Sequence, residues 1–221
     1  MNNMNGTVEV KFQELFKLGY LVCRVPQVVT DAIDEEIRPM ISRNFIGANP
    51  YNYGLAGAIQ HEYTLKKCMP ILSPMVCAVA ASYWNHWKLF DRAKKKHWIR
   101  FNEGTGEYDV WANFQRKYEH NPLHTHGGTL SFVIWHQIPY DIEEEKKLPH
   151  LNRGNTGAAG VFAFNYPNFL EKGGVSQHLI EVSKIREHDM IIFPSFLQHS
   201  VYPFYTSDDF RISISGNIDH D

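Results

Sequence analysis

Residues 190–218 read MIIFPSFLQHSVYPFYTSDDFRISISGNI. Runs typical of strands, over residues 190–193, 200–203 and 210–218, are separated here by turn residues such as Pro, Ser and Asp. In the last run isoleucine and polar side chains alternate, and a period of two residues is typical of a strand with one buried face. This stretch therefore predicts strands that return antiparallel to one another.

The same character extends back through the second half of the chain. Further strands are expected over residues 98–102, 109–118, 130–138, 160–165 and 178–181. Many short strands favour a jelly roll or barrel, and helices in the first half would buttress one face of it. The charged run at residues 141–147, DIEEEKK, is expected to be a solvated loop between strands.

The first half mixes strands and helices. Strands are expected at residues 8–12 and 20–25, and a helix from Thr30 to about Asn44. The segment 44–63 is rich in Gly, Asn and Tyr and predicts a loop.

A second helix is expected to begin with Ser73 as its N-cap and Pro74 as its first residue. Apolar side chains follow it at helical spacing and predict a face packed on a sheet: Val76, Val79, Ala80, Tyr83, Trp87 and Phe90. The 221 residues suit one domain, with residues 1–97 as mixed support and residues 98–218 as the β core.

Charge and cysteine content narrow the possible functions. The chain has 22 basic and 24 acidic residues, which argues against a nucleic-acid binder that works through a basic face. No apolar run approaches the roughly 18 residues of a membrane-spanning helix, and the start MNNMNGTVEV does not resemble a signal peptide. The three cysteines, Cys23, Cys68 and Cys77, form no CxxC, so a reducing, cytoplasmic location is expected.

Histidines are concentrated at one point of the chain. Of the 12 in the chain, His120, His124 and His126 lie within seven residues. In an extended segment His124 and His126 share a face and could chelate one metal ion, although a single strand histidine is more often structural. His120 precedes Asn121-Pro122 and is expected in an exposed loop, outside the ligand set.

Two further candidates follow in the opening stretch. His199 comes just after an apolar strand, and an antiparallel return would let it reach a site on an earlier strand. In residues 211–218, Arg211 and Ser213 alternate with isoleucines. If the isoleucines pack under the helices, Arg211 points into the barrel and requires an anion. If the isoleucines point inward instead, Arg211 is exposed, and the pattern alone leaves both arrangements open.

The combined spacing resembles a known family. His-x-His, a long gap, Phe-Pro-Ser-x-x-x-His and Arg-x-Ser twelve residues later are similar to the 2-oxoglutarate and Fe(II)-dependent oxygenases. The similarity is greatest to a subgroup with phage and marine bacterial members that is related to prolyl 4-hydroxylases. Residues 111–128 resemble the first sequence block of this subgroup and residues 193–217 its last. Residues 54–57 suggest that the resemblance extends further toward the start of the chain.

The resemblance implies a double-stranded β-helix (jelly roll, cupin-like) that holds iron at its open end. His124 and His199 take the family's two histidine positions, and His126 takes the position of the usual acidic ligand. Arg211, with Ser213 beside it, takes the position that binds the distal carboxylate of 2-oxoglutarate. A second departure is Ser131-Phe132, where the subgroup often has Ser-Gly.

The implied cofactors are Fe(II), the cosubstrate 2-oxoglutarate and O2. The implied reaction hydroxylates an unactivated C–H bond while 2-oxoglutarate becomes succinate and CO2; a third protein ligand leaves no vacancy for halide, which disfavours halogenation. Kinship with prolyl hydroxylases suggests a prolyl residue of a peptide, or free proline, as substrate. The location becomes the host cytoplasm if a phage encodes the chain. Four aromatic residues are candidates to line the pocket: Trp111, Trp135, Tyr202 and Tyr205.

Two other functions compete with this one. A three-histidine cupin-type dioxygenase would need no 2-oxoglutarate, and Arg211 with Ser213 argues against it. A non-catalytic jelly-roll binding module would have no affinity for iron. Formation of succinate that depends on 2-oxoglutarate separates the first from the favoured function, and iron binding separates the second.

Overall fold

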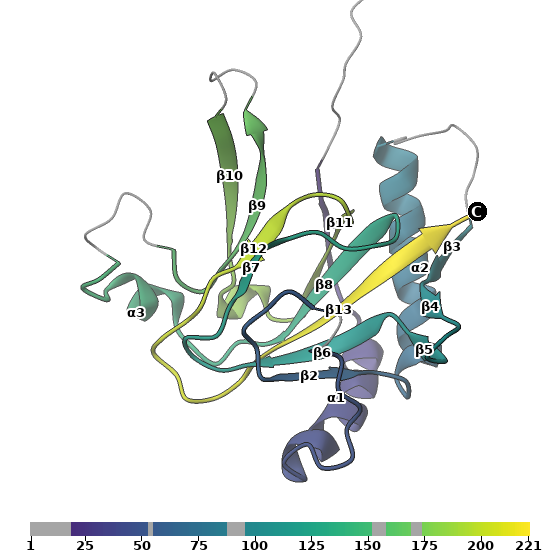
Figure 1. The fold of residues 1–221 in the computed structure, drawn as a ribbon, viewed down its shortest axis with the longest axis horizontal. Coiled ribbons are helices and arrows are strands. Elements are labelled where there is room, and N and C mark those ends of the chain that lie inside the picture. Colours follow the sequence, from purple (N-terminus) through teal and green to yellow (C-terminus); the bar gives the residue numbers. More distant parts are fainter. Residues whose placement is uncertain (1–18, 53–54, 88–95, 152–157, 169–173) are drawn as a thin grey trace, which may run out of the picture.

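Two antiparallel sheets face each other in the computed structural model, which describes residues 19–52, 55–87, 96–151, 158–168 and 174–221 (Figure 1). The large sheet has the order β1-β11-β8-β13-β6-β2, with β3 paired to β13. Its strands are β1 (Leu21–Arg24), β2 (His61–Thr64), β3 (His97–Ile99), β6 (Val110–Gln115), β8 (Leu130–Gln137), β11 (Asp189–Pro194) and β13 (Arg211–His220). The expected mainly β, double-stranded β-helix architecture is confirmed.

The small sheet covers one face of the large one. Its order is β10-β9-β12-β7, and its strands are β7 (Asn121–His124), β9 (Val161–Asn168), β10 (Gly174–Glu181) and β12 (His199–Val201). A separate hairpin joins β4 (Phe101–Asn102) to β5 (Glu107–Tyr108).

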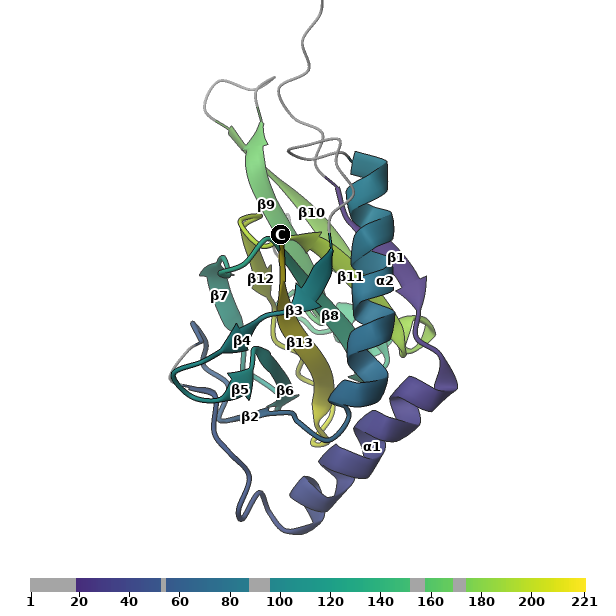
Figure 2. The ribbon, with the colours of Figure 1, turned by 90° about the vertical axis from the view of Figure 1, so that its right-hand side faces the viewer.

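Helices cover the other face of the large sheet, as Figure 2 shows for α1 (Gln27–Ser42) and α2 (Met69–Trp87). The pleat of β13 sends Ile212 and Ile214 into the core that these helices share with the sheet. Trp135 of β8 belongs instead to a second apolar cluster, between the sheets. Because the pleat alternates, the same strands carry a helix-facing side and an interior side.

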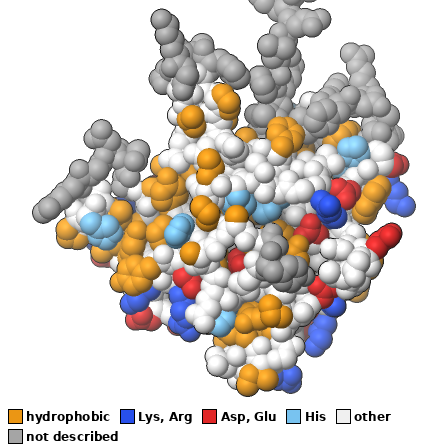
Figure 3. All heavy atoms as spheres, viewed as in Figure 1, with side chains coloured by type: hydrophobic (Ala, Val, Ile, Leu, Met, Phe, Trp, Pro, Cys, Tyr) orange, Lys and Arg blue, Asp and Glu red, His pale blue; other side chains and the backbone are white. Residues whose placement is uncertain are grey.

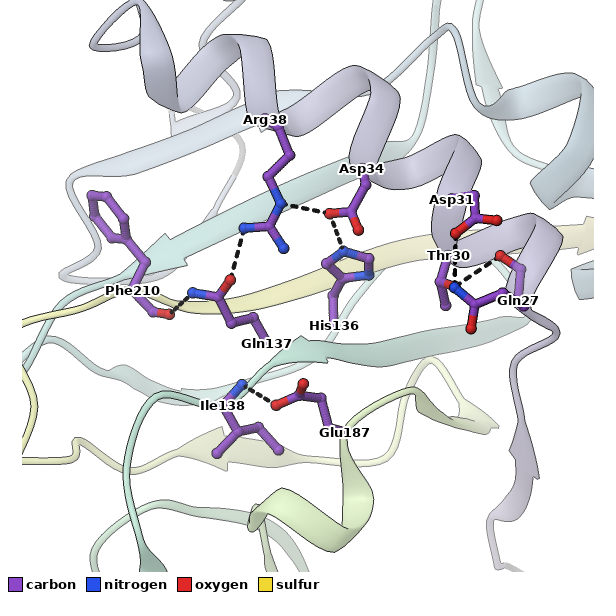
Figure 4. Close-up of polar contacts among 10 residues, drawn as sticks. All are labelled: Gln27, Thr30, Asp31, Asp34, Arg38, His136, Gln137, Ile138, Glu187 and Phe210. Atoms are coloured by element: carbon purple, nitrogen blue, oxygen red, sulfur yellow. Dashed lines mark hydrogen bonds and ion pairs between the residues drawn. The ribbon is translucent and has the colours of Figure 1, made fainter.

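Polar contacts as well as apolar packing hold α1 on the sheet (Figure 4). Asp34 accepts hydrogen bonds from Arg38 at 2.7 Å and from the buried imidazole of His136 at 2.8 Å. Arg38 also donates to Gln137 at 2.7 Å, and the Gln137 amide donates to the carbonyl of Phe210 at 3.0 Å. This chain of contacts links α1 to the strand β8 and to the start of β13.

Helix α1 covers residues 27–42 rather than 30–44. It begins directly after Pro26, and Pro39 lies inside it. It ends where Asn44 and Phe45 take positive φ angles of 48° and 61°, which close the last turn.

Helix α2 begins at Met69, so the expectation that Pro74 is its first residue is wrong. The carboxylate of Glu36, in α1, accepts hydrogen bonds from the backbone N–H groups of Lys66 and Cys68, just before α2 begins. A carboxylate from a distant helix thus takes the role of a local cap, and Pro74 is accommodated inside the first turns.

Two expected loops contain regular structure. Residues 61–64, expected as the end of a loop, form the edge strand β2. The charged run holds helix α3 (Ile142–Lys146), with Asp141 as its N-cap, and Glu145 in it is fully buried. Glu145 can be buried because its carboxylate accepts hydrogen bonds from the backbone N–H groups of Tyr205 and Thr206.

The strands expected from the sequence otherwise occur within a few residues of their predicted bounds. The strand expected at residues 8–12 lies outside the described residues, as do Phe90 and Gly54. Among the described helices, none has both the length and the apolar character needed to cross a bilayer.

Candidate metal centre

Pairing of β7 with β12 brings two histidines together. His124, at the end of β7, is directly opposite His199, at the start of β12. A register shift follows between His199 and Val201, so that Val201 pairs with Asn121. Such a bulge lets Asn121 and His124, three residues apart, both line the interior pocket.

His126 lies just beyond β7 in a loop with fixed backbone contacts. Its N–H donates to the carbonyl of Ser195 at 2.9 Å, and the Ser195 hydroxyl donates to the carbonyl of Gly128. Gly128 has a φ of 86°, which a side chain would strain. The loop therefore returns toward β11 and holds the His126 ring near the other two.

The three imidazoles form one cluster. Nitrogen atoms of His124, His126 and His199 all lie within 4.8 Å of one another. The Nε2 atoms of His126 and His199 are 3.2 Å apart, and the ring centroids of His124 and His199 are 4.2 Å apart. This spacing suits three donors directed at a single ion.

Backbone carbonyls set the tautomers of two of the rings. His124 Nδ1 donates to the carbonyl of Pro122 at 2.7 Å, and His199 Nδ1 donates to that of Leu197 at 2.9 Å. In a neutral ring with Nδ1 protonated, Nε2 keeps its lone pair. Both histidines therefore present an unprotonated nitrogen to the cluster, as metal-binding histidines oriented by a backbone carbonyl do.

Burial keeps these imidazoles neutral. Desolvation, with the charge of His124 as a smaller cause, lowers the pKa of His126 to about 3. Desolvation lowers the pKa of His199 well below its ordinary value, and that of His124 is lowered for the same reason. Neutral imidazole is the form that binds a metal ion.

Arg211 points into the interior. Of the two arrangements that the sequence left open, the structure therefore has the one in which the isoleucines pack under the helices. It is 3% exposed, and its guanidinium donates to Gln115 Oε1, to the Tyr140 hydroxyl at 3.0 Å and to the carbonyl of Tyr202 at 2.9 Å. Within the described part of the chain no carboxylate forms an ion pair with it. A buried cation held only by neutral acceptors is suited to an anion.

Ser213 lies beside Arg211 on the same strand and the same face. Its hydroxyl accepts a hydrogen bond from the amide of Asn113 at 3.2 Å, and the same amide donates to Ser215. The Trp111 indole in turn donates to Asn113 at 3.0 Å. Alternate residues of β6 and β13 thus form a polar strip beside the guanidinium.

One pocket contains both groups. The three histidines, Arg211 and Ser213 all line it. Of the four aromatic candidates, Trp111 and Trp135 line it, whereas Tyr202 contributes its backbone carbonyl to Arg211 and Tyr205 is absent from the lining. His120 is exposed and does not join the cluster, in line with its expected place in an exposed loop.

Sequence reasoning missed three residues that surround the guanidinium or its strip. Gln115 and Asn113 share a face with Trp111 on β6, so the period of two could have revealed them. Tyr140 follows β8 in an irregular segment, where no periodic pattern places its hydroxyl near Arg211.

Comparison with known proteins supports the same family. Residues 109–217 match the family model described as "Putative 2OG-Fe(II) oxygenase". This region runs from just before β6 to within β13 and contains every histidine of the cluster, Arg211 and Ser213. No curated protein matches the chain.

Solved structures show the same fold. A prolyl 4-hydroxylase from Pseudomonas putida aligns with a TM-score of 0.51 and 14% identity, over 91% of this chain and 92% of its own. A prolyl hydroxylase from Trichoplax adhaerens, in complex with a peptide fragment of the hypoxia-inducible factor oxygen degradation domain, has a TM-score of 0.51 and 10% identity. That alignment covers 91% of this chain and 83% of the neighbour. Both neighbours share the overall fold of this chain.

An enzyme of this family works with Fe(II), 2-oxoglutarate and O2, and the histidine cluster and the buried arginine share one pocket. The matched region includes every strand residue that lines this pocket, and the chain belongs to the 2OG-Fe(II) oxygenases.

Proposed function

We propose that this enzyme hydroxylates a prolyl residue in a peptide or protein, with His124, His126 and His199 as iron ligands and with Arg211 and Ser213 binding 2-oxoglutarate. The observation that carries the proposal is the shared pocket: three neutral imidazoles at one place and a buried guanidinium without a carboxylate partner at another. The prolyl substrate is suggested by the two prolyl hydroxylases of the same fold.

The residues fit the implied metal ion. Imidazole nitrogen is a suitable donor for iron, and three protein ligands on one side of the ion leave positions for other molecules. Bound Fe(II), with 2-oxoglutarate and O2, supplies the oxidation of a C–H bond as 2-oxoglutarate becomes succinate and CO2. The protein's part is to hold, orient and enclose the reactants.

The three imidazoles carry no charge, unlike the family's usual set with one carboxylate. The ligand set is therefore less negative by one charge. A dianionic 2-oxoglutarate would balance the two positive charges of Fe(II), and the positive charge of Arg211 would remain in the pocket.

Arg211 fixes the far end of 2-oxoglutarate. Its guanidinium can donate a charge-assisted hydrogen bond to a carboxylate through the second N–H of Nη1, which no described residue accepts, and Ser213 adds a hydroxyl from the same face. The Gln115 and Tyr140 contacts hold the guanidinium in place before binding, which reduces the entropy lost when the carboxylate binds.

Apolar side chains enclose the space between the two ends. Val133, Trp135 and Phe162 line the same pocket as the histidines and Arg211. They exclude water from the reacting atoms, which strengthens the electrostatic contacts and limits side reactions.

We also propose that the chain acts as one oxygenase domain in the cytoplasm, or in the host cytoplasm if a phage encodes it. The free thiols of Cys23, Cys68 and Cys77 support a reducing location.

The decisive experiment combines an anaerobic titration with turnover. Fe(II) and 2-oxoglutarate are titrated into the protein without oxygen, and proline-containing peptides and free proline are then added with O2. We expect succinate that depends on 2-oxoglutarate and a product heavier by one oxygen atom at proline. Product without succinate would favour a three-histidine cupin-type dioxygenase, and failure to bind iron would favour a binding module.

A further inference from the structure

Two different surfaces meet at the metal-facing end of the barrel. The first, here called the aromatic groove, is lined by Tyr20, Phe164, Tyr166, Pro167 and Phe196, among others. The second, here called the polar cleft, is lined by Tyr51, Arg100, Glu103, Glu107, Asp109 and Asn217, among others. Figure 3 shows histidine side chains near the centre of this face, hydrophobic ones toward β9 and β10, and charged ones toward β4 and β5.

Thr125 joins the two surfaces. This exposed residue lies between His124 and His126 in the chain and lines both the aromatic groove and the polar cleft. The polar cleft also shares Trp111 and His126 with the interior pocket. The two surfaces therefore form one path that passes the histidine cluster.

The aromatic groove offers exposed rings. Tyr166 is 43% exposed and Phe196 is 49% exposed, while Tyr20 is held against His178 by a hydrogen bond of 2.9 Å between its hydroxyl and Nε2. Gln198 and Asn165 add amide groups to the same lining. Aromatic-lined grooves with a few polar groups bind extended apolar and prolyl segments of peptides.

The polar cleft has an excess of negative charge, since three carboxylates and one guanidinium line it. Glu107 is paired with Lys66 at 3.0 Å, and Arg100 approaches Asp219 only to 3.9 Å. The two oxygens of Asp109 accept from neutral donors, the Tyr51 hydroxyl and the Asn217 amide. With Glu107 paired to Lys66, the charges that remain in the lining are those of Asp109, the exposed Glu103 and Arg100. Their sum is negative, and it complements a basic side chain.

We propose that the substrate is an extended peptide that crosses Thr125, with an apolar flank in the aromatic groove and a basic flank in the polar cleft. This inference rests on the proposed function, because it assumes that the reacting residue lies at the histidine cluster. It selects a peptide over free proline, which is too small to reach either surface from the pocket.

Three labelled peptides test the idea by fluorescence anisotropy with the full chain, Fe(II) and 2-oxoglutarate under anaerobic conditions. They are Phe-Leu-Gly-Pro-Gly-Lys-Lys, the reversed Lys-Lys-Gly-Pro-Gly-Leu-Phe, and Ser-Ser-Gly-Pro-Gly-Ser-Ser. One of the first two peptides should bind at least about tenfold more tightly than the serine peptide. The order of the flanks in that peptide gives the direction in which a substrate peptide crosses Thr125. Equal affinity for all three overturns the proposal.

Variants locate the two flanks. Phe196→Ala and Tyr166→Ala should each weaken the tighter peptide about two- to tenfold, as expected for the loss of one aromatic contact. Glu103→Gln should weaken it up to about fivefold at low salt and less at high salt. Tyr118→Ala, a change of a ring that is 64% exposed and outside both surfaces, is the matched control and should have no effect. Unchanged binding in all three site variants contradicts the proposal.

Succinate release in the same samples, after O2 is admitted, distinguishes failure of the peptide path from failure of the proposed function. If succinate forms and the groove and cleft variants bind every peptide as wild type does, only the peptide path is wrong. If neither peptides nor free proline yield succinate, the proposed function itself fails.

Discussion

The two faces of the large sheet differ in chemistry although the same strands build them. Toward the helices, β13 presents Ile212 and Ile214 to the apolar core. Toward the small sheet, it presents Arg211, Ser213 and Ser215 to the pocket. One face therefore contributes mainly stability and the other mainly binding, and substitutions on adjacent residues should have separable effects.

The largest effect is expected from removal of a histidine of the cluster that we propose to bind iron. His199→Ala should reduce iron affinity and succinate formation by more than about a hundredfold, because even residues that only orient a metal ligand account for 10- to 100-fold. Iron content after anaerobic reconstitution and succinate release are the measurements. His120→Ala, an exposed neighbour of the cluster in sequence, should retain both.

Next in size is the loss of the guanidinium. Arg211→Ala should weaken 2-oxoglutarate binding by about 2–5 kcal/mol, which is roughly 30- to several thousand-fold. Arg211→Lys should recover only part of it, since an ammonium lacks the planar pair of donors. The dependence of succinate release on 2-oxoglutarate concentration measures this, and iron binding should persist. An unchanged dependence in the alanine variant would remove Arg211 from the site.

On the other face, Ile214→Ala should lower the free energy of unfolding by about 2–5 kcal/mol, because it leaves a cavity in a fully buried core. Denaturant unfolding provides the measurement. In the protein that remains folded, the concentration dependence for 2-oxoglutarate should match that of wild type. A change in that dependence as large as that of Arg211→Ala would mean that the two faces are not separable.

The smallest effect is a pH dependence of the metal-free protein. His126 has a folded pKa of about 3, below the ordinary 6.5, so below pH 6.5 the unfolded chain binds a proton that the folded chain does not. Stability is then lost as pH falls, by at most about 1.4 kcal/mol per pH unit for this residue.

Comparison with His126→Gln isolates this contribution. Burial raises the pKa of Glu62 to about 7, so protonation of Glu62 stabilises the folded state as pH falls. This opposing effect is the same in wild type and in the variant and cancels in the comparison. Denaturant unfolding between pH 7 and pH 5 should show wild type losing stability faster than the variant. Parallel curves would contradict a neutral, partly buried His126.

The strand pattern could be predicted from sequence because burial on one face imposes a period of two. That period correctly assigned Ile212 and Ile214 to the helix side once the helices were assumed to cover the sheet. It could not assign the start of α2, because Glu36 caps that helix from another element. Nor could it reveal that Glu145, in a charged run, is buried against the backbone of residues 205 and 206.

The candidate site was predictable to a similar degree. The spacing of the histidines and of Arg211 and Ser213 was sufficient to select them, through resemblance to a family. The partners of the guanidinium were not, since the Tyr140 hydroxyl and the Tyr202 carbonyl come from irregular segments. Such contacts depend on tertiary structure, and local sequence carries no periodic sign of them.

The pairing of β1 with β11 has a consequence for synthesis in the cell. Leu21 pairs with Ile192, so one edge of the large sheet joins the first described strand to one near the end of the chain. Contacts between residues so far apart in sequence are slow to form, and the ribosome adds only about 5–20 residues per second. The first strand therefore waits roughly 10–30 seconds for its neighbour at that rate of synthesis, and during that interval its backbone hydrogen-bonding groups are open to pairing with other chains.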